Sequence, residues 1–325
     1  MSHGQSQRPA DSAPPNALPL WAIGPHGLHL AEVPTRADGR LPTFLVIGAA
    51  KCGTTALHAY LDLHPDVAMC HYKEPHFFST DVLYERGLEW YTGLFAGLAP
   101  AKACGGSSTS YTRAPEYPAT AARIHAAMPD IRLVYVVREP VTRTESDILQ
   151  AVKYARHALG RRADAVDLER LLEENPVAIH SSEYIVQIRA YLEYFGSDQL
   201  LVLLQSDLRD DPHGTLSKIF AHVGVDPSFR ITLAPPKNAT SDFLDGVRDE
   251  RLVERLRHLP GYAMLRSLIP AGIKRGIKRL GRSFVQPEAE LAFTPATRMR
   301  LHEHFRPFNA ELAEFLGRDL SAWDR

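Results

Sequence analysis

Apolar runs alternate along the chain with stretches in which apolar residues recur every three or four positions. Near-continuous apolar runs are typical of strands buried on both faces of a parallel sheet, and the wider spacing indicates amphipathic helices. The strands predicted in this way are residues 44–47, 131–137 and 200–204. The predicted helices are residues 54–64, 141–154, 185–195 and 215–223. This alternation predicts an α/β fold, in which helices cover both faces of a mostly parallel sheet.

Two parts of the chain lack a regular pattern. Residues 1–42 are rich in Pro, Ser and Gly, which predicts a flexible tail and a short N-terminal extension. Within it, residues 18–23 and 28–33 are able to pair as a hairpin. Residues 235–296 have the least regular pattern, which we interpret as a C-terminal helical insertion or lid. The rest of residues 43–325 is expected to be a single domain.

Composition narrows the classes of function. The 325 residues carry 37 Lys and Arg against 38 Asp and Glu, and a dedicated nucleic-acid binder would usually show a basic excess. Three cysteines without metal-ligand spacing argue against a disulfide framework and a zinc module, which favours a reducing compartment. We find neither an apolar run long enough to span a membrane nor a secretion signal. The composition therefore predicts a soluble, cytoplasmic protein.

The strongest local signal is a glycine-containing loop between the first strand and its helix. Gly48 and Gly53 bracket this loop, and Thr54 and Thr55 follow it. Backbone amides in such a turn, with the positive end of a helix behind them, form an anion site. A strand-to-helix turn that binds nothing is the alternative. Together with the predicted parallel sheet, this loop predicts a P-loop-like fold.

The position of the lysine separates this loop from that of nucleotide hydrolases. A P-loop of those enzymes carries lysine after its second glycine, whereas here Thr54 takes that place and Lys51 lies inside the loop. A metal-dependent phosphate site also needs an acidic residue after a second strand. The strand at 131–137 ends instead in Arg138, and Asp207 is only a loose candidate. Lys51 therefore suits a single phosphate whose bridging oxygen becomes a leaving group.

Several motifs in order along the chain resemble one enzyme family. They are Lys51-Cys52-Gly53-Thr54-Thr55, Lys73-Glu74-Pro75-His76-Phe77-Phe78, Gly87-Leu88-Glu89-Trp90-Tyr91, Arg138-Glu139-Pro140-Val141-Thr142-Arg143, Leu301-His302-Glu303-His304-Phe305 and Phe315-Leu316-Gly317-Arg318-Asp319-Leu320. The sequence resembles the sulfotransferases that use 3′-phosphoadenosine 5′-phosphosulfate (PAPS), in particular the branch with the heparan sulfate N- and 3-O-sulfotransferases. The likeness spans residues 43–234 and 297–325.

The resemblance implies roles for individual residues in binding the PAPS co-substrate, without a metal ion. It assigns the 5′-phosphate to the loop residues Lys51, Cys52, Gly53, Thr54 and Thr55. The 3′-phosphate would be bound by Arg138 and Ser146. The alternative roles are a strand-end salt bridge for Arg138 and a solvent-facing position for Ser146, while Arg143 is expected to be structural or at the rim.

These residue types suit sulfuryl transfer. Negative charge grows on the bridging oxygen as the S–O bond breaks, so the fixed ammonium of Lys51 stabilises the transition state more than the ground state. Arg138 follows a parallel strand at the ligand-binding edge of the sheet, where a guanidinium binds phosphate in bidentate fashion. Cys52 occupies a variable slot of the motif and is not expected to be a nucleophile.

The resemblance also implies the general base. Glu74 matches the glutamate that takes the acceptor's proton in the glycan branch, and Phe77 and Phe78 are expected to raise its pKa. The alternatives are that Glu74 only pairs with Lys73, or that His76 is the base.

Two features leave the acceptor open between a glycan and a small metabolite, sulfated on a hydroxyl or an amine. The Glu-Lys pair of the glycan enzymes is missing from residues 106–111. In addition, five cations lie in residues 273–282, and we interpret this basic stretch as part of a lid or of the substrate rim.

Two other functions are alternatives to a sulfotransferase. One is a P-loop kinase that uses ATP and magnesium, and the other is a nucleotide-binding protein of the same fold with impaired catalysis. The oligomeric state does not follow from the sequence.

Overall fold

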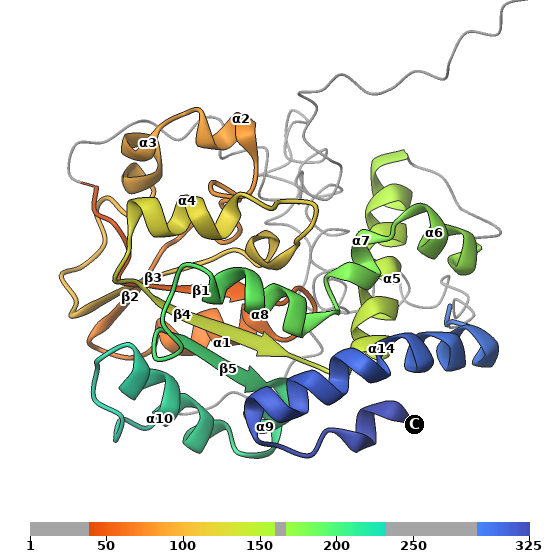
Figure 1. Ribbon diagram of the computed structural model, residues 1–325. Coiled ribbons are helices and arrows are strands. Elements are labelled where there is room, and N and C mark those ends of the chain that lie inside the picture. Colours follow the sequence, from red (N-terminus) through yellow and green to blue (C-terminus); the bar gives the residue numbers. More distant parts are fainter. Residues whose placement is uncertain (1–38, 160–166, 232–290) are drawn as a thin grey trace, which may run out of the picture. The chain divides into compact units, whose positions relative to one another are not determined.

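A computed structural model describes residues 39–159, 167–231 and 291–325 (Figure 1). The described residues up to Ile231 and from Ala292 onward belong to one compact unit. The predicted N-terminal hairpin, the basic stretch 273–282 and most of the predicted insertion 235–296 lie outside the described residues. No described helix is both long and apolar enough to cross a membrane.

The centre of the unit is a parallel sheet of five strands in the order β2-β3-β1-β4-β5. The strands are β1 (Phe44–Gly48), β2 (Val67–Met69), β3 (Ala103–Ser107), β4 (Arg132–Val137) and β5 (Leu200–Leu204). The predicted strands in β1, β4 and β5 are confirmed, and every residue of β1 is buried. Because parallel strands share a direction, their carboxyl ends lie along one edge of the sheet.

The apolar pattern misses β2 and β3 for a physical reason. β2 has only 3 residues, and β3 reads Ala-Cys-Gly-Gly-Ser without a branched or aromatic side chain. A Cβ at Gly105 would lie 2.2 Å from the ring of Phe44 and 2.5 Å from the sulfur of Met69. The glycine therefore leaves room for side chains of the neighbouring strands, and its small size hides the strand from the sequence pattern.

Helices flank the sheet, with α1 and α8 on opposite sides (Figure 1). Helix α5 begins three residues after β4, and α9 begins directly after β5, so both start at the carboxyl edge of the sheet. The helical elements are α1 (Thr54–Leu61), α2 (Asp81–Tyr84), α3 (Leu88–Gly93), η2 (Thr109–Thr112), α4 (Thr120–Ala127), α5 (Pro140–Leu159), α6 (Leu168–Glu174), α7 (Val177–His180), α8 (Tyr184–Leu192), α9 (Gln205–Asp210), α10 (Pro212–His222), α14 (Pro295–Leu316) and η3 (Ser321–Asp324). The predicted helices correspond to α1, α5, α8 and α10.

The first residues of α14 are anchored to α5. Thr294 caps α14 by accepting a hydrogen bond from Thr297 N at 3.2 Å, and Glu145 of α5 accepts one from Phe293 N at 2.7 Å. Arg298 forms an ion pair with Glu145 at 2.6 Å. The predicted irregular segment therefore extends too far, because residues 295–296 already belong to the capped helix α14.

Candidate functional site

The loop between β1 and α1 adopts a conformation that turns its backbone sharply. Gly53 lies in the left-handed region with φ 87°, and Lys51 reaches φ 69°, which side chains rarely adopt. Ala49 N donates to Val136 O of β4 at 2.7 Å, and Cys52 N donates to Ala49 O at 3.2 Å. The loop is thus tied to β4 and closed by a bond within itself, and it ends at the first turn of α1, where a helix favours an anion.

Arg143 of α5 contacts the backbone of this loop. Its side chain is fully buried, and its Nε donates to Ala50 O at 3.1 Å, while one Nη donates to Ala178 O at 2.7 Å. The other Nη donates to Asp147 at 2.8 Å. The structural role expected for Arg143 agrees with these contacts, which link the loop, α5 and α7.

The predicted loop residues differ in exposure. Lys51 is half-buried, and its Nζ lies 2.5 Å from Gln150 Oε1 on α5. Thr54 is buried and Thr55 is exposed on the first turn of α1. Cys52 is fully buried, and this burial raises the pKa of its thiol to about 11. The thiol is therefore protonated at neutral pH, in agreement with the expectation that Cys52 is no nucleophile.

Arg138 joins the loop at the end of the adjacent strand. It directly follows β4, and its Nη1 donates to Lys51 O at 3.4 Å. Ser146 lies half-buried farther along α5, the helix that carries Gln150 and Asp147. Although burial opposes its charge, the guanidinium groups of Arg143 and Arg113 and the ammonium of Lys51 lower the pKa of Asp147. Cationic side chains thus gather around the start of α5.

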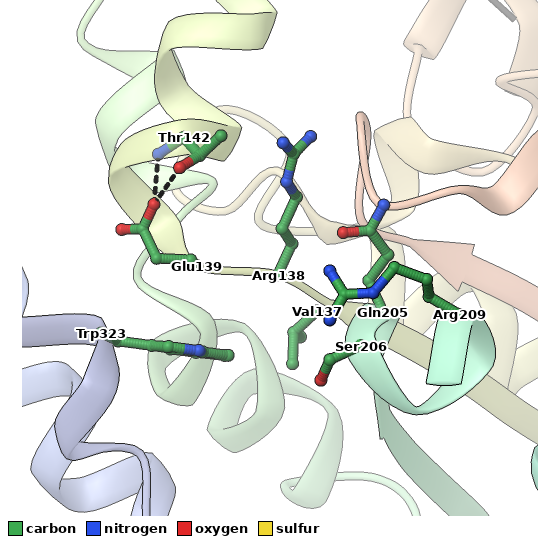
Figure 2. A pocket seen from close by; sticks show the side chains of 8 residues that line it. All are labelled: Val137, Arg138, Glu139, Thr142, Gln205, Ser206, Arg209 and Trp323. Carbon is green, nitrogen blue, oxygen red and sulfur yellow. Dashed lines mark hydrogen bonds between the residues drawn. The ribbon is translucent and has the colours of Figure 1, made fainter. Parts of the chain in front are cut away.

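A cavity of about 380 Å³ opens beside Arg138, at the ends of β4 and β5 (Figure 2). It is lined by Val137, Arg138, Glu139, Thr142, Gln205, Ser206, Arg209 and Trp323. Sequence reasoning missed the lining residues after β5, although the end of a predicted parallel strand is a usable signal for a site. No pattern in the sequence pointed to Trp323.

The Lys73–Glu74 segment lies at the end of β3. Glu74 N donates to Ser107 O at 2.9 Å, and Glu74 has a left-handed backbone with φ 61°. Its Oε2 accepts hydrogen bonds from Thr109 N at 2.6 Å and Thr109 Oγ1 at 3.0 Å, and its Oε1 pairs with Lys73. The segment that lacks the Glu-Lys pair therefore supplies Thr109, which the sequence analysis did not single out.

The expected rise in the pKa of Glu74 is wrong. Burial opposes the charge of the carboxylate, but Lys73, His76 and the hydrogen bond from Thr109 N lower its pKa to about 2. Phe77 and Phe78 do not isolate the carboxylate as expected. They are buried in an aromatic cluster, in which Phe77 stacks on Tyr91 with ring centres 4.7 Å apart.

His76 is buried in a cluster of hydroxyl groups. Its Nδ1 lies 2.8 Å from Ser110 Oγ, and Ser110 Oγ lies 2.7 Å from Ser79 Oγ. Burial lowers the pKa of His76 to about 4, against the favourable effect of Glu74. The imidazole is therefore neutral at pH 7, and its contacts join the 74–80 segment to the chain after β3.

The low pKa of His76 predicts a pH-dependent stability. Its pKa is about 4 in the folded protein and 6.5 ordinarily, so the stability it contributes is complete above pH 6.5 and is lost as the pH falls toward 4. Between pH 7 and pH 5 the loss amounts to about 2 kcal/mol. In urea denaturation at both pH values, His76→Asn should reduce the pH dependence by that amount.

A matched control separates His76 from other histidines. His213→Asn replaces an exposed imidazole on α10 and should leave the difference between pH 7 and pH 5 unchanged. Equal pH dependence in wild type and His76→Asn would contradict the assignment.

The acidic residue considered for a metal is engaged elsewhere. Asp207 of α9 pairs with Arg318, whose two Nη atoms lie 2.5 and 3.0 Å from the carboxylate oxygens. Within the described ranges, no group of three or more His, Cys, Asp and Glu has the geometry of a metal site.

The sheet order brings the predicted residues to one edge. The strands β3, β1 and β4 are neighbours, and their carboxyl ends lead into Thr109, the Lys51 loop and Arg138, respectively. Glu74 belongs to the chain after β2 and meets the end of β3 through Ser107 and Thr109. Ser108 N donates to Val46 O at 3.1 Å, which ties the chain after β3 to β1. A loop with the geometry of an anion site therefore lies at the end of the strand next to β3, where Thr109 holds a carboxylate.

Comparisons with known proteins agree on one family. A sulfotransferase domain model matches residues 41–241. Heparan sulfate glucosamine 3-O-sulfotransferase 6 of Mus musculus is 30% identical over 331 residues, which cover 97% of this chain and 82% of that protein. The human protein of the same name is 31% identical over 312 residues, or 91% of this chain and 77% of that one. The crystal structure of a sulfotransferase from Alicyclobacillus acidocaldarius has a TM-score of 0.60 at 25% identity, and covers 88% of this chain and 100% of that one.

Proposed function

Because the chain belongs to the sulfotransferase family and is an enzyme of that class, we propose that it transfers a sulfuryl group from PAPS to a hydroxyl or amine of an acceptor. One observation carries this proposal. The Lys51 loop and Arg138 follow the neighbouring strands β1 and β4, and Arg138 Nη1 lies 3.4 Å from Lys51 O. Glu74 is hydrogen-bonded to Ser107 and Thr109 at the end of β3, the neighbour of β1 on the other side.

The donor would bind along the ends of β1 and β4. Loop amides and the hydroxyl groups of Thr54 and Thr55 hold the 5′-phosphate, and Arg138 with Ser146 binds the 3′-phosphate. The ammonium of Lys51 faces the oxygen that bridges phosphorus and sulfur. As the S–O bond to this oxygen breaks, the fixed positive charge of Lys51 stabilises the negative charge that develops there.

The acceptor would approach from the side of β3. Its oxygen or nitrogen forms the new bond to sulfur in line with the breaking bond, and its proton passes to a carboxylate oxygen of Glu74. A pKa of about 2 keeps Glu74 ionised but makes it a weak base. An acceptor that displaces Lys73 from Glu74 removes the nearest positive charge, which raises the basicity of the carboxylate.

A glycan hydroxyl is the first acceptor to test, because two relatives bear the name heparan sulfate glucosamine 3-O-sulfotransferase. A small metabolite is the second. The test incubates the protein with radiolabelled PAPS and heparan sulfate, de-sulfated heparan sulfate, phenols or a metabolite extract. Transfer of the label to one acceptor is the expected result. Absence of transfer, with tight binding of ATP and magnesium and none of 3′-phosphoadenosine 5′-phosphate, would refute the proposal.

The role of Glu74 has its own prediction. Glu74→Gln keeps the shape and the hydrogen-bond acceptor for Thr109 but removes the base, so kcat is expected to fall by roughly a hundredfold or more. Glu85→Gln changes an exposed carboxylate next to α2 and should leave kcat unchanged. If His76→Ala is damaging while Glu74→Gln is mild, the base is His76.

We also propose that the protein is located in the cytoplasm. All three cysteines, Cys52, Cys70 and Cys104, are buried free thiols, which suits a reducing compartment. Cell fractionation with an antibody to this chain is the direct test.

A further inference from the structure

The imidazole of His58 connects α1 to the end of β3. His58 is half-buried on α1, and its Nδ1 lies 2.9 Å from the Oγ of Ser107. Ser107 is the buried last residue of β3, and its carbonyl oxygen accepts a hydrogen bond from Glu74 N at 2.9 Å. His58 and Glu74 therefore contact the same residue, one at its side chain and the other at its backbone.

The place of His58 on α1 also relates it to the loop that precedes the helix. His58 follows Thr54 by four positions and Thr55 by three, so the three residues share one side of the helix. Side chains of a helix lean toward its N-terminus, and the loop with Lys51 ends there. The imidazole thus extends from the side of α1 that begins at the loop to the end of β3.

Charged groups of the site act on this imidazole. Burial and the ammonium of Lys73 lower the pKa of His58 from its ordinary value of 6.5. Asp62, Glu74 and a hydrogen bond to the backbone of Cys70 favour the charged form but do not outweigh them. The imidazole is therefore neutral at pH 7. A neutral imidazole has one donor and one acceptor nitrogen, and a serine hydroxyl serves as either partner, so the contact at the end of β3 forms whichever nitrogen carries the proton.

Hydroxyl groups rather than charges hold the end of β3 and the residues after it. Residues 106–111 carry no charged side chain. The hydroxyl of Thr109 contacts the carboxylate of Glu74, whereas the hydroxyl of Ser107 reaches α1. The contact with His58 is therefore a direct link between the helix that follows the loop and the strand end that holds Glu74.

In-line transfer needs a fixed separation between the donor and the base, since a misplacement of about 1 Å can cost a hundredfold in rate. We infer that His58 is a positioning residue, which acts through Ser107 to fix Glu74 relative to α1 and its loop. This inference rests on the proposed function, because it takes the loop as the donor site and Glu74 as the base. His58 itself need not touch the donor or the acceptor.

Two substitutions of His58 separate positioning from packing. His58→Leu keeps a side chain of similar size but loses the contact with Ser107, so kcat for sulfuryl transfer should fall about tenfold or more. The KM for PAPS and the calorimetric affinity for adenosine 3′,5′-bisphosphate should stay near those of wild type. His58→Asn places an amide where Nδ1 lies and should recover most of the lost kcat. The matched control is His125→Leu, which replaces a half-buried imidazole on α4 and should leave kcat unchanged.

A double-mutant cycle tests whether the effect passes through the hydroxyl. Ser107→Ala should lower kcat by a factor similar to that of His58→Leu. Because both substitutions remove the same contact, the double variant should lose little more than either single variant. Effects that multiply in the double variant would mean that His58 does not act through Ser107, which overturns the inference. If His58→Leu does not fold, Ser107→Ala decides, since wild-type kcat in that variant overturns the inference.

The remaining outcomes distinguish this inference from the proposed function. Wild-type kcat in His58→Leu overturns the inference and leaves the proposed function standing. Equal losses of kcat in His58→Leu and His58→Asn also overturn it, because the hydrogen bond is then not the cause. A loss of affinity for the bisphosphate that matches the loss of kcat overturns it too, since His58 then acts on the donor loop. If the wild type transfers no label to any acceptor, the proposed function fails and the inference fails with it.

Discussion

Replacing Lys51 by alanine is expected to lower kcat for sulfuryl transfer by roughly a hundred- to a thousandfold, because it removes the charge that stabilises the leaving oxygen. Lys51 projects from the loop at the end of β1, and its Nζ contacts Gln150 Oε1 at 2.5 Å. Initial rates with labelled PAPS at saturating acceptor measure the effect. Since the half-buried side chain makes this contact at the surface of α5, the melting temperature should change little.

The control for this variant is Lys218→Ala, which removes an exposed lysine on α10 and should keep full activity. Gln150→Ala, which removes the contact of Lys51 Nζ with Gln150 Oε1 but keeps the ammonium, should cost less than the loss of the lysine itself. Near-normal turnover of Lys51→Ala would remove this residue from the mechanism.

Arg143→Leu is expected to destabilise the fold by about 3–5 kcal/mol, because it leaves the carboxylate of Asp147 without its closest charge partner. The guanidinium of Arg143 is fully buried, and it also holds the carbonyl groups of Ala50 and Ala178. Urea denaturation at pH 7 measures the loss. Because Ala50 belongs to the loop between β1 and α1 that is proposed to bind the 5′-phosphate, binding of adenosine 3′,5′-bisphosphate should weaken as well.

Arg170→Ala is the matched control for this prediction. Arg170 also forms an ion pair with an acidic residue four positions away, Glu174, but both side chains are exposed. Exposed pairs contribute little because water and salt screen them, so the midpoint of unfolding should stay close to that of wild type. A similar small effect for Arg143→Leu would show that the buried network does not stabilise the loop.

The contrast between the strands shows how far local pattern predicts the fold. Strands β1, β4 and β5 were found because, apart from Arg132 at the start of β4, their side chains are apolar or aromatic and are buried or half-buried. β3 was missed because Gly105 must make room for Phe44 and Met69. Such a requirement arises between strands far apart in the chain and leaves no local signal.

The candidate site likewise combines residues that local sequence patterns predict with residues that only the fold brings together. The loop around Lys51 and the position of Arg138 were predicted from the sequence, because a glycine turn and a strand end are local features. Thr109 and Trp323 were not predicted as site residues. Thr109 meets Glu74 from 35 positions away, and Trp323 reaches the cavity only because α14 and its contacts carry it there.

The sequence by itself determined the family resemblance, the α/β class, and which residues are candidates for phosphate binding and acid–base chemistry, because these depend on residue type and short spacing. The tertiary structure decided how that chemistry is tuned. It placed Thr109 beside the carboxylate of Glu74, which also pairs with its sequence neighbour Lys73. Although burial opposes the charge, these groups and His76 lower the pKa of Glu74 to about 2, where the neighbouring phenylalanines had suggested a rise. Charges and hydrogen bonds act through space over a few ångströms, and only the folded arrangement of β3, β1 and β4 defines which groups come that close.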